Sequence, residues 1–234
     1  MAGRLVLITG VGRPGQVGES VARLFAEREH RVILVSRRVD EVDARTSALR
    51  DAGFDAAGYS CDLADSQQVS ALADRVSADH GDALHALVNL AGGFAVSGPV
   101  GGSDAGGWEH MARINLLTAY HATRSFLPHL RRARGAIVYF ASASALPGAS
   151  VAGTWAYSAA KGAVLTLMRA VASEERQAGV RANAVAPTAI RTASNLETVG
   201  DQVSYVERDD VAEAVWYLCS DQSHAVTGQV VRLG

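Results

Sequence analysis

Short apolar runs alternate along this chain with stretches whose apolar residues recur at helical spacing. Residues 5–8 and 32–35 are uniformly apolar, which is typical of strands buried on both faces of a parallel sheet. Between them, Val21, Leu24 and Phe25 recur on one face of a helix. The chain is therefore predicted to begin with a strand, a helix and a second strand.

The same alternation continues to the last residues. Further strands are predicted at 59–61, 84–90, 136–141, 180–185 and 229–233, and helices at 39–49, 69–76, 108–127, 157–177 and 210–220. Repeated strand–helix units fold into one parallel sheet with right-handed crossovers. The predicted fold class is therefore α/β, a single Rossmann-type doubly wound parallel sheet with helices on both faces. Such sheets bind ligands at the carboxyl ends of their strands.

Length and charge narrow the possible functions. The 234 residues fit one domain, so residues 1–234 are expected to fold as a single unit. With 22 Lys and Arg against 24 Asp and Glu, the chain lacks the basic excess of nucleic-acid-binding proteins. No apolar run approaches the roughly 20 residues of a membrane span, and the first residues resemble no secretory leader. We expect no nucleic-acid partner and no membrane partner.

The cysteines and histidines indicate neither a disulfide framework nor a metal site. Cys61 and Cys219 are the two cysteines of the chain, and the seven histidines show no metal-ligand spacing. We therefore expect a cytoplasmic protein without a metal.

A glycine-rich segment lies between the first predicted strand and helix. Gly10, Gly12 and Gly15 fit the pattern G-x-G-x-x-G, and Gly18 follows. Glycines let the backbone approach a pyrophosphate closely, and the positive end of the following helix attracts the anion. The segment predicts a dinucleotide site, with a plain strand-to-helix turn as the alternative.

The end of the second strand bears on the choice of cofactor. An acidic residue there would bind the ribose hydroxyls and favour NAD. This chain has Ser36 followed by Arg37 and Arg38, and Arg13 in the glycine segment adds another cation. These arginines could hold a 2′-phosphate, which favours NADP; as the alternative, they are solvated surface charges.

A tyrosine and a lysine lie four residues apart on one face of a predicted helix. They are Tyr157 and Lys161. A free tyrosine has a pKa near 10, and a neighbouring cation lowers it. Tyr157 could then exchange a proton with a substrate oxygen. A serine at the end of the preceding strand, Ser142 or Ser144, could hydrogen-bond that oxygen.

These features occur in the order typical of one family. The sequence resembles the short-chain dehydrogenase/reductase family, in its 3-oxoacyl-carrier-protein reductase-like branch, over nearly its whole length. The matching segments are Thr9-Gly10, Asp62-Leu63, Asn89-Leu90-Ala91-Gly92, Asn115, Ser142, Tyr157, Lys161, residues 183–192 and residues 227–231.

The resemblance implies an NAD(P)(H)-dependent oxidoreductase that interconverts a carbonyl and a secondary alcohol by direct hydride transfer. Tyr157 would be the general acid in reduction, Lys161 would lower its pKa and bind the nicotinamide ribose, Ser142 would position the carbonyl, and Asn115 would maintain a proton relay. The implied cofactor-binding residues are Gly10, Gly12, Arg13, Gly15, Gly18, Arg37, Arg38, Asp62, Leu63, Asn89, Ala91, Gly92, Tyr157, Lys161, Pro187, Ile190 and Thr192.

The sequence departs from the family pattern at three places. The glycine segment is two residues longer than usual and contains Pro14, Leu90 follows Asn89 where a second asparagine is usual, and Thr188 stands where glycine usually follows Pro187. Counting from the strand selects Ser142 as the catalytic serine, whereas counting back from Tyr157 selects Ser144. We favour Ser142, because the strand fixes its place.

Two aromatic residues are candidates for contact with the substrate. Phe94 and Trp155 either pack on an apolar substrate or close the core. The segment that covers the substrate in the family corresponds to residues 193–208, and it is shorter here than is usual in the family. A catalytically reduced nucleotide-binding regulator or scaffold is the alternative function, and an epimerase or dehydratase would need a longer chain. The resemblance implies a homodimer or homotetramer built on the helices beside the catalytic strand.

Overall fold

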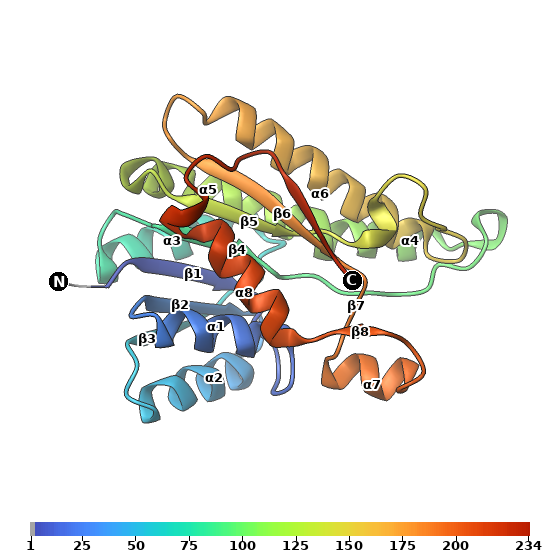
Figure 1. The fold of residues 1–234 in the computed structure, drawn as a ribbon, viewed down its shortest axis with the longest axis horizontal. Coiled ribbons are helices and arrows are strands. Elements are labelled where there is room, and N and C mark those ends of the chain that lie inside the picture. Colours follow the sequence, from blue (N-terminus) through green and yellow to red (C-terminus); the bar gives the residue numbers. More distant parts are fainter. Residues whose placement is uncertain (1–2) are drawn as a thin grey trace.

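Seven parallel strands form one sheet in the computed structural model, which describes residues 3–234 (Figure 1). Their order across the sheet is β3-β2-β1-β4-β5-β6-β9. The bounds are β1 Leu5–Thr9, β2 Arg31–Ser36, β3 Ala56–Ser60, β4 Ala86–Asn89, β5 Ala136–Phe140, β6 Arg181–Pro187 and β9 Val230–Leu233. The order reverses direction between β1 and β4, which is where a doubly wound sheet binds its ligand.

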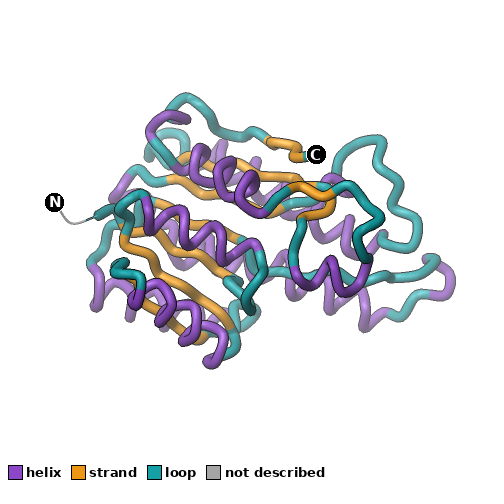
Figure 2. Tube along the Cα trace, turned by 60° about the horizontal axis from the view of Figure 1, so that its bottom comes forward, coloured by secondary structure: helices purple, strands orange, loops and turns teal. Residues whose placement is uncertain are grey.

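Helices cover both faces of the sheet (Figures 1 and 2). Helices α1 (Val17–Glu27), α2 (Val39–Asp51) and α8 (Arg208–Cys219) pack on one face. Helices α3 (Ser66–His80), α5 (Thr118–Ala133) and α6 (Trp155–Glu174) pack on the other. This arrangement confirms the predicted fold class.

Two apolar layers, one on each face, explain why the strands are uniformly apolar. Along β1, Val6 and Ile8 enter the layer that contains Phe25 of α1, whereas Leu7 enters the layer that contains Phe126 of α5. All five residues are at most 1% exposed. Because both faces are covered, apolar residues are favoured along the strand, and the buried Thr9 at its end donates its hydroxyl to the Val88 carbonyl oxygen at 3.2 Å.

The helix expected at 108–127 is divided in the structure. Helix α4 (Ala105–Ala112) leads through a π turn (Arg113–Leu117) into α5. Single π turns inside helices are frequent at functional sites. Here the turn carries Asn115, one of the predicted catalytic residues, and its side chain is 1% exposed.

Residues 189–206 form a small structure of their own beside the sheet (Figure 1). Helix α7 (Ala193–Val199) lies between two short strands, β7 (Ala189–Ile190) and β8 (Tyr205–Val206), which pair in parallel. Thr192 caps α7, because its hydroxyl accepts a hydrogen bond from the Asn195 amide at 3.2 Å. The hydrophobic pattern did not predict this helix, which buries none of its residues.

Within residues 3–234, no helix is long and apolar enough to cross a membrane. The same residues contain no cluster of three or more His, Cys, Asp or Glu side chains that could hold a metal ion.

Candidate active site

Lys161 is buried at the centre of the site. It follows Tyr157 by one turn of α6, and its Nζ donates a hydrogen bond to the carbonyl oxygen of Phe140, the last residue of β5, at 2.8 Å. Its Nζ lies 5.8 Å from the centroid of the Tyr157 ring. Burial lowers the pKa of Lys161 to about 8. A buried lysine whose pKa is lowered this far is typical of a functional site.

Tyr157 is half-buried and is thus less enclosed than Lys161. Burial raises the pKa of its hydroxyl above the ordinary value, and a hydrogen bond with Ser142 partly opposes that rise. This direction is opposite to the one expected from the sequence. The reason is that Tyr157 is desolvated, while the Lys161 ammonium is directed to the Phe140 carbonyl oxygen.

The structure distinguishes the two candidate serines. Ser142 is the serine whose side chain lowers the pKa of the Tyr157 hydroxyl, and both residues line one cavity. Ser144 shares a hydrogen bond with Ser142, with their Oγ atoms 3.0 Å apart, and it accepts another from Ser158 of α6 at 3.0 Å. Ser142 thus faces the tyrosine, and Ser144 links it to the catalytic helix.

Asn115 is held by hydrogen bonds to the main chain after β4 and to α4. Its Nδ2 donates to the carbonyl oxygens of Gly93 and Met111, at 3.0 and 3.1 Å, and its Oδ1 accepts from the Gly93 amide. A Cβ atom at Gly92 would lie 2.5 Å from Asn115 Oδ1 and 3.2 Å from Lys161 Nζ. Only glycine therefore allows the chain after β4 to pass so close to both side chains.

A cavity of about 660 Å³ opens onto Tyr157 and Ser142. Phe94 lines it and meets the Tyr157 ring edge to face, with centroids 5.1 Å apart. Trp155 instead stacks on Trp108 of α4 at 5.8 Å. Of the two aromatic residues considered from the sequence, Phe94 thus faces the cavity, and Trp155 joins α6 to α4. Most of the remaining wall comes from residues 143–154 and from α7, and Thr188, Ala189 and Arg232 complete it.

A second cavity, of about 320 Å³, follows the carboxyl ends of β1, β2, β3 and β4. Predicted residues that line it are Gly10, Gly12, Arg37, Asp62, Leu63, Ala91 and Gly92. Gly10 and Gly12 have φ of 68° and 66°, and a Cβ at Gly10 would lie 2.4 Å from the Ala91 Cα. The glycine backbone thus forms a cradle at the point between β1 and β4 where the strand order reverses. This nucleotide cradle fits the adenosine end of a dinucleotide.

The three candidate arginines differ in their partners. Arg37 lines the nucleotide cavity, whereas Arg13 forms an ion pair with Glu197 at 2.7 Å and Arg38 one with Asp40 at 2.6 Å. Glu41, which belongs to none of the sequence motifs, also lines the cavity and accepts a hydrogen bond from Ser36 at 3.2 Å. Its position five residues after Ser36, in the first turn of α2, is the signal that could have revealed it.

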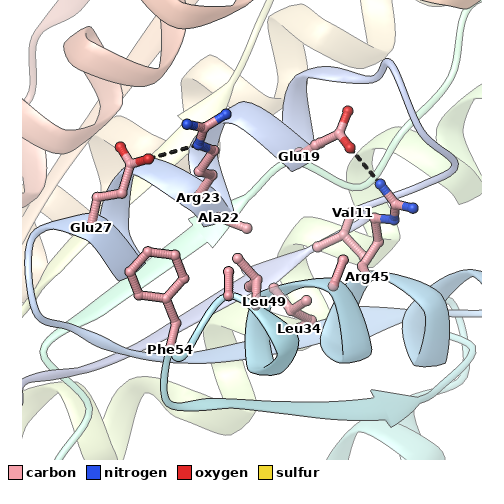
Figure 3. A pocket seen from close by; sticks show the side chains of 12 residues that line it. Val11, Glu19, Ala22, Arg23, Glu27, Leu34, Arg45, Leu49 and Phe54 are labelled. Carbon is pink, nitrogen blue, oxygen red and sulfur yellow. Dashed lines mark hydrogen bonds and ion pairs between the residues drawn. The ribbon is translucent and has the colours of Figure 1, made fainter.

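Gly15 and Gly18 do not line the nucleotide cavity and pack against other parts of the chain. The Gly15 oxygen accepts a hydrogen bond from Ala193 of α7 at 2.9 Å, and a Cβ on Gly18 would lie 2.7 Å from the Val11 Cα. The neighbouring Glu19 carboxylate accepts from the Gly15 amide at 2.8 Å and pairs with Arg45 of α2. Figure 3 shows this pair at one side of a cavity of about 400 Å³ between α1 and α2, with the Arg23–Glu27 pair at the other side. These contacts fix the shape of the lengthened segment.

The other predicted binding residues stabilise the fold or lie beside the site. Asn89 is 4% exposed and donates to the Thr123 hydroxyl at 3.2 Å, so it ties β4 to α5. Pro187 ends β6, Ile190 belongs to β7 and Thr192 caps α7. These three lie along the chain that leads from the sheet to the cavity wall.

Comparison with known proteins decides the family. Residues 10–233 match the family described as enoyl-(acyl carrier protein) reductase. A cis-4-hydroxycyclohexanecarboxylate dehydrogenase of Sinomonas cyclohexanicum is 32% identical, over 98% of this chain and 94% of its own length. This chain belongs to the short-chain dehydrogenase/reductase family.

Solved structures of family members agree. A gluconate 5-dehydrogenase of Burkholderia cenocepacia, in complex with NADP and tartrate, superimposes with a TM-score of 0.91 and 27% identity, covering 100% of this chain and 94% of that one. An actinorhodin polyketide ketoreductase variant with NADPH gives 0.88 and 28%, covering 98% and 95%. The protein is thus a short-chain dehydrogenase/reductase, an enzyme that uses a nicotinamide cofactor on alcohol or carbonyl substrates, and the scaffold alternative is not favoured.

Proposed function

We propose that Tyr157, Ser142, Lys161 and Asn115 carry the reaction, a reversible reduction of a ketone to a secondary alcohol. The observation that supports this most directly is the Tyr157–Ser142 pair at the base of the 660 Å³ cavity, beside the nucleotide cradle. A carbonyl oxygen placed between the two hydroxyl groups would receive two hydrogen bonds. These bonds strengthen as negative charge develops on that oxygen.

The bound nicotinamide would supply or accept the hydride. Tyr157 would donate its proton to the forming alkoxide, and in the reverse direction it would accept one. The raised pKa of Tyr157 suits the reductive direction, because the hydroxyl remains protonated at neutral pH. Lys161, while charged, would stabilise the phenolate that remains. Asn115 would hold the Gly92–Gly93 backbone beside both groups.

The decisive experiment compares wild type with Tyr157→Phe. A Tyr157 hydroxyl that acts as general acid predicts a loss of about 10²- to 10⁴-fold in kcat on any ketone the wild type reduces. NADPH binding, followed by fluorescence titration, should be retained. Unchanged turnover would contradict the proposed role. A wild-type protein that binds NADPH but reduces no member of a broad ketone panel would instead support a regulatory role.

We further infer that NADP is preferred over NAD. Arg37 supports this, because it lines the nucleotide cavity and no described acidic side chain forms an ion pair with it. A 2′-phosphate contact would favour NADPH by about tenfold or more, equivalent to about 1.4 kcal/mol. Parallel titrations with NADPH and NADH test this, and Arg37→Gln should remove the difference. A tighter complex with NADH would point to Glu41 as the group that selects the cofactor.

We also infer a single domain, a homodimer or homotetramer, and a cytoplasmic location. The seven-stranded sheet draws its strands from residues 5 to 233, which supports one domain. Leu117, the last residue of the π turn, and Tyr120 of α5 are 39% and 42% exposed, which suits a helix that packs on a second copy. Both cysteines are free thiols, consistent with a reducing compartment. Light scattering after size-exclusion chromatography measures the subunit number, and a monomer would contradict the inference.

A further inference from the structure

Arg232 occupies an unusual place for an arginine, in the last strand of the sheet. Side chains alternate between the two faces along a strand. Val231 and Leu233 pack into the layer formed by α1 and α8. Arg232, between them, must therefore point to the opposite face, which α6 and its Tyr157 cover.

The register of β9 carries Arg232 to the substrate cavity. β9 pairs in parallel with β6, with Arg232 beside Ala186 and Leu233 beside Pro187. Ala186 belongs to the apolar layer on the α6 side. Arg232 thus lies at the carboxyl end of the sheet, and it lines the same 660 Å³ cavity as Tyr157 and Ser142. Among the described residues that line this cavity, it is the one formally charged at neutral pH.

The contacts of Arg232 leave most of its guanidinium available. Its Nε donates to the main-chain oxygen of Gly234 at 3.1 Å. Within residues 3–234, no acidic side chain pairs with Arg232, whereas Arg13 and Arg191 at the edge of the same region pair with Glu197, Asp201 and Glu207. Its two terminal nitrogens have no hydrogen-bond partner among the described residues. They form the planar edge that binds a carboxylate through two parallel hydrogen bonds.

The rest of the wall is mostly apolar. Phe94, Leu146, Pro147 and Val199 line it together with Arg232. Arg232 itself is exposed to solvent, so these apolar walls strengthen its attraction for an anion only in part. The cavity therefore has two distinct ends, a pair of hydroxyl groups and a guanidinium, joined by apolar walls.

We propose that the substrate carries a carboxylate, which Arg232 binds while Tyr157 and Ser142 hold the reacting oxygen. The substrate class is then an oxo acid, or the hydroxy acid formed from it. The inference rests on the proposed function, since it assigns the same cavity to the substrate. Arg232 acts here as a specificity-determining residue and takes no part in proton transfer.

The test compares acids with their methyl esters, which differ by one charge. The probes are acetoacetate and levulinate with methyl acetoacetate and methyl levulinate, offered to wild type and to Arg232→Gln, Arg232→Lys and Arg75→Gln in the presence of NADPH. For at least one pair, wild type should favour the acid by about 10- to 100-fold in kcat/KM, the range for a hydrogen bond to a charged group. Arg232→Gln should abolish this preference while ester reduction persists, and Arg232→Lys should restore part of it. Arg75→Gln, which removes one exposed charge on α3, should behave as wild type.

A binding measurement separates this inference from the proposed function. Calorimetric titration of the NADP-loaded protein with each acid and ester measures the preference without turnover. Acid binding that depends on Arg232, without reduction of any probe, would uphold the anion site and count against the proposed reaction. Equal binding of acid and ester by wild type, or a preference that survives in Arg232→Gln, would overturn the inference. Equal binding would also show that the Gly234 oxygen satisfies the guanidinium.

Discussion

At the scale of single residues, the site combines groups whose burial is unfavourable for stability. Lys161 is 5% exposed and has one hydrogen bond, to the Phe140 carbonyl oxygen. Its pKa of about 8, against 10.5 for the free group, means that the folded protein binds the lysine proton more weakly than the unfolded chain does. Below pH 8 this difference lowers the free energy of unfolding, by about 3 kcal/mol when fully expressed. The cost disappears as the pH rises from 8 towards 10.5.

Lys161→Met is therefore expected to stabilise the protein while it destroys activity. The gain of about 3 kcal/mol is offset in part by about 1 kcal/mol for the hydrogen bond lost at the Phe140 oxygen. The melting temperature should rise by a few degrees at pH 7, and the gain should vanish near pH 10. Thermal unfolding of both proteins at the two pH values checks this. A variant less stable than wild type at pH 7 would contradict it.

A kinetic comparison should distinguish the roles of Ser142 and Ser144. Ser142→Ala removes the hydroxyl that faces Tyr157, so kcat should fall by about 10²- to 10³-fold. Ser144→Ala removes a hydroxyl that contacts Ser142 and Ser158, and a loss below about tenfold is expected from one neutral hydrogen bond. Steady-state rates on the same ketone, with NADPH saturating, measure both effects. The reverse order would assign the catalytic role to Ser144.

At the scale of elements, the lengthened glycine segment is bound directly to α7. The Ala193 amide donates to the Gly15 oxygen at 2.9 Å, Gln16 donates to the Ser194 hydroxyl at 2.9 Å, and Arg13 pairs with Glu197. One end of α7 therefore contacts the nucleotide side, while its Asn195 and Val199 line the substrate cavity. Binding on the two sides is expected to be coupled through this helix.

Gly15→Ala tests this connection, with Gly53→Ala as its matched control. Both glycines have positive φ, 76° and 87°, so either substitution should cost about 1 kcal/mol of stability. A Cβ at Gly15 would also lie 3.0 Å from the Ala193 Cβ, whereas one at Gly53 meets nothing within 4 Å. Only Gly15→Ala should weaken NADPH binding, by about tenfold, which corresponds to about 1.4 kcal/mol. Equal NADPH affinity of the two variants would show that the contact with α7 is unimportant.

At the scale of the whole molecule, several histidines are held neutral by the fold. Burial is the main cause that lowers the pKa of His30, His80, His85 and His129. His85, just before β4, accepts a hydrogen bond from the Leu5 amide at 3.1 Å through Nδ1. This bond requires an unprotonated nitrogen, so the junction between β1 and β4 depends on neutral histidine.

The protein is therefore expected to lose stability on mild acidification. Because the pKa values of these histidines are lowered in the folded state, the unfolded chain binds more protons below about pH 6.5. The free energy of unfolding should change little between about pH 7 and pH 8, below the range in which Lys161 titrates, and it should fall as the pH decreases to 5. Denaturant unfolding across this range measures the slope. His85→Asn should reduce it, whereas His224→Gln, at an exposed position, should not; a stability independent of pH would contradict the argument.

Local sequence determined most of the framework. Uniformly apolar runs such as residues 32–35 can be stable only when both faces of a strand are covered, and this predicted the parallel sheet. The four-residue spacing of Tyr157 and Lys161 likewise fixed their common face on a helix. The order of the motifs was sufficient to indicate the family that the comparisons confirmed.

Tertiary structure decided whatever depends on residues far apart in the chain. The direction of the Tyr157 pKa shift depends on desolvation, which no spacing reports. The pairing of Arg13 with Glu197 joins two segments separated by 184 positions. The presence of Arg232 in the substrate cavity follows from the pairing of β9 with β6. The sequence by itself thus determined the elements and the residues that bear the chemistry, because these follow from local periodicity. Only the fold decided their surroundings, because burial and charge pairing arise when distant segments meet.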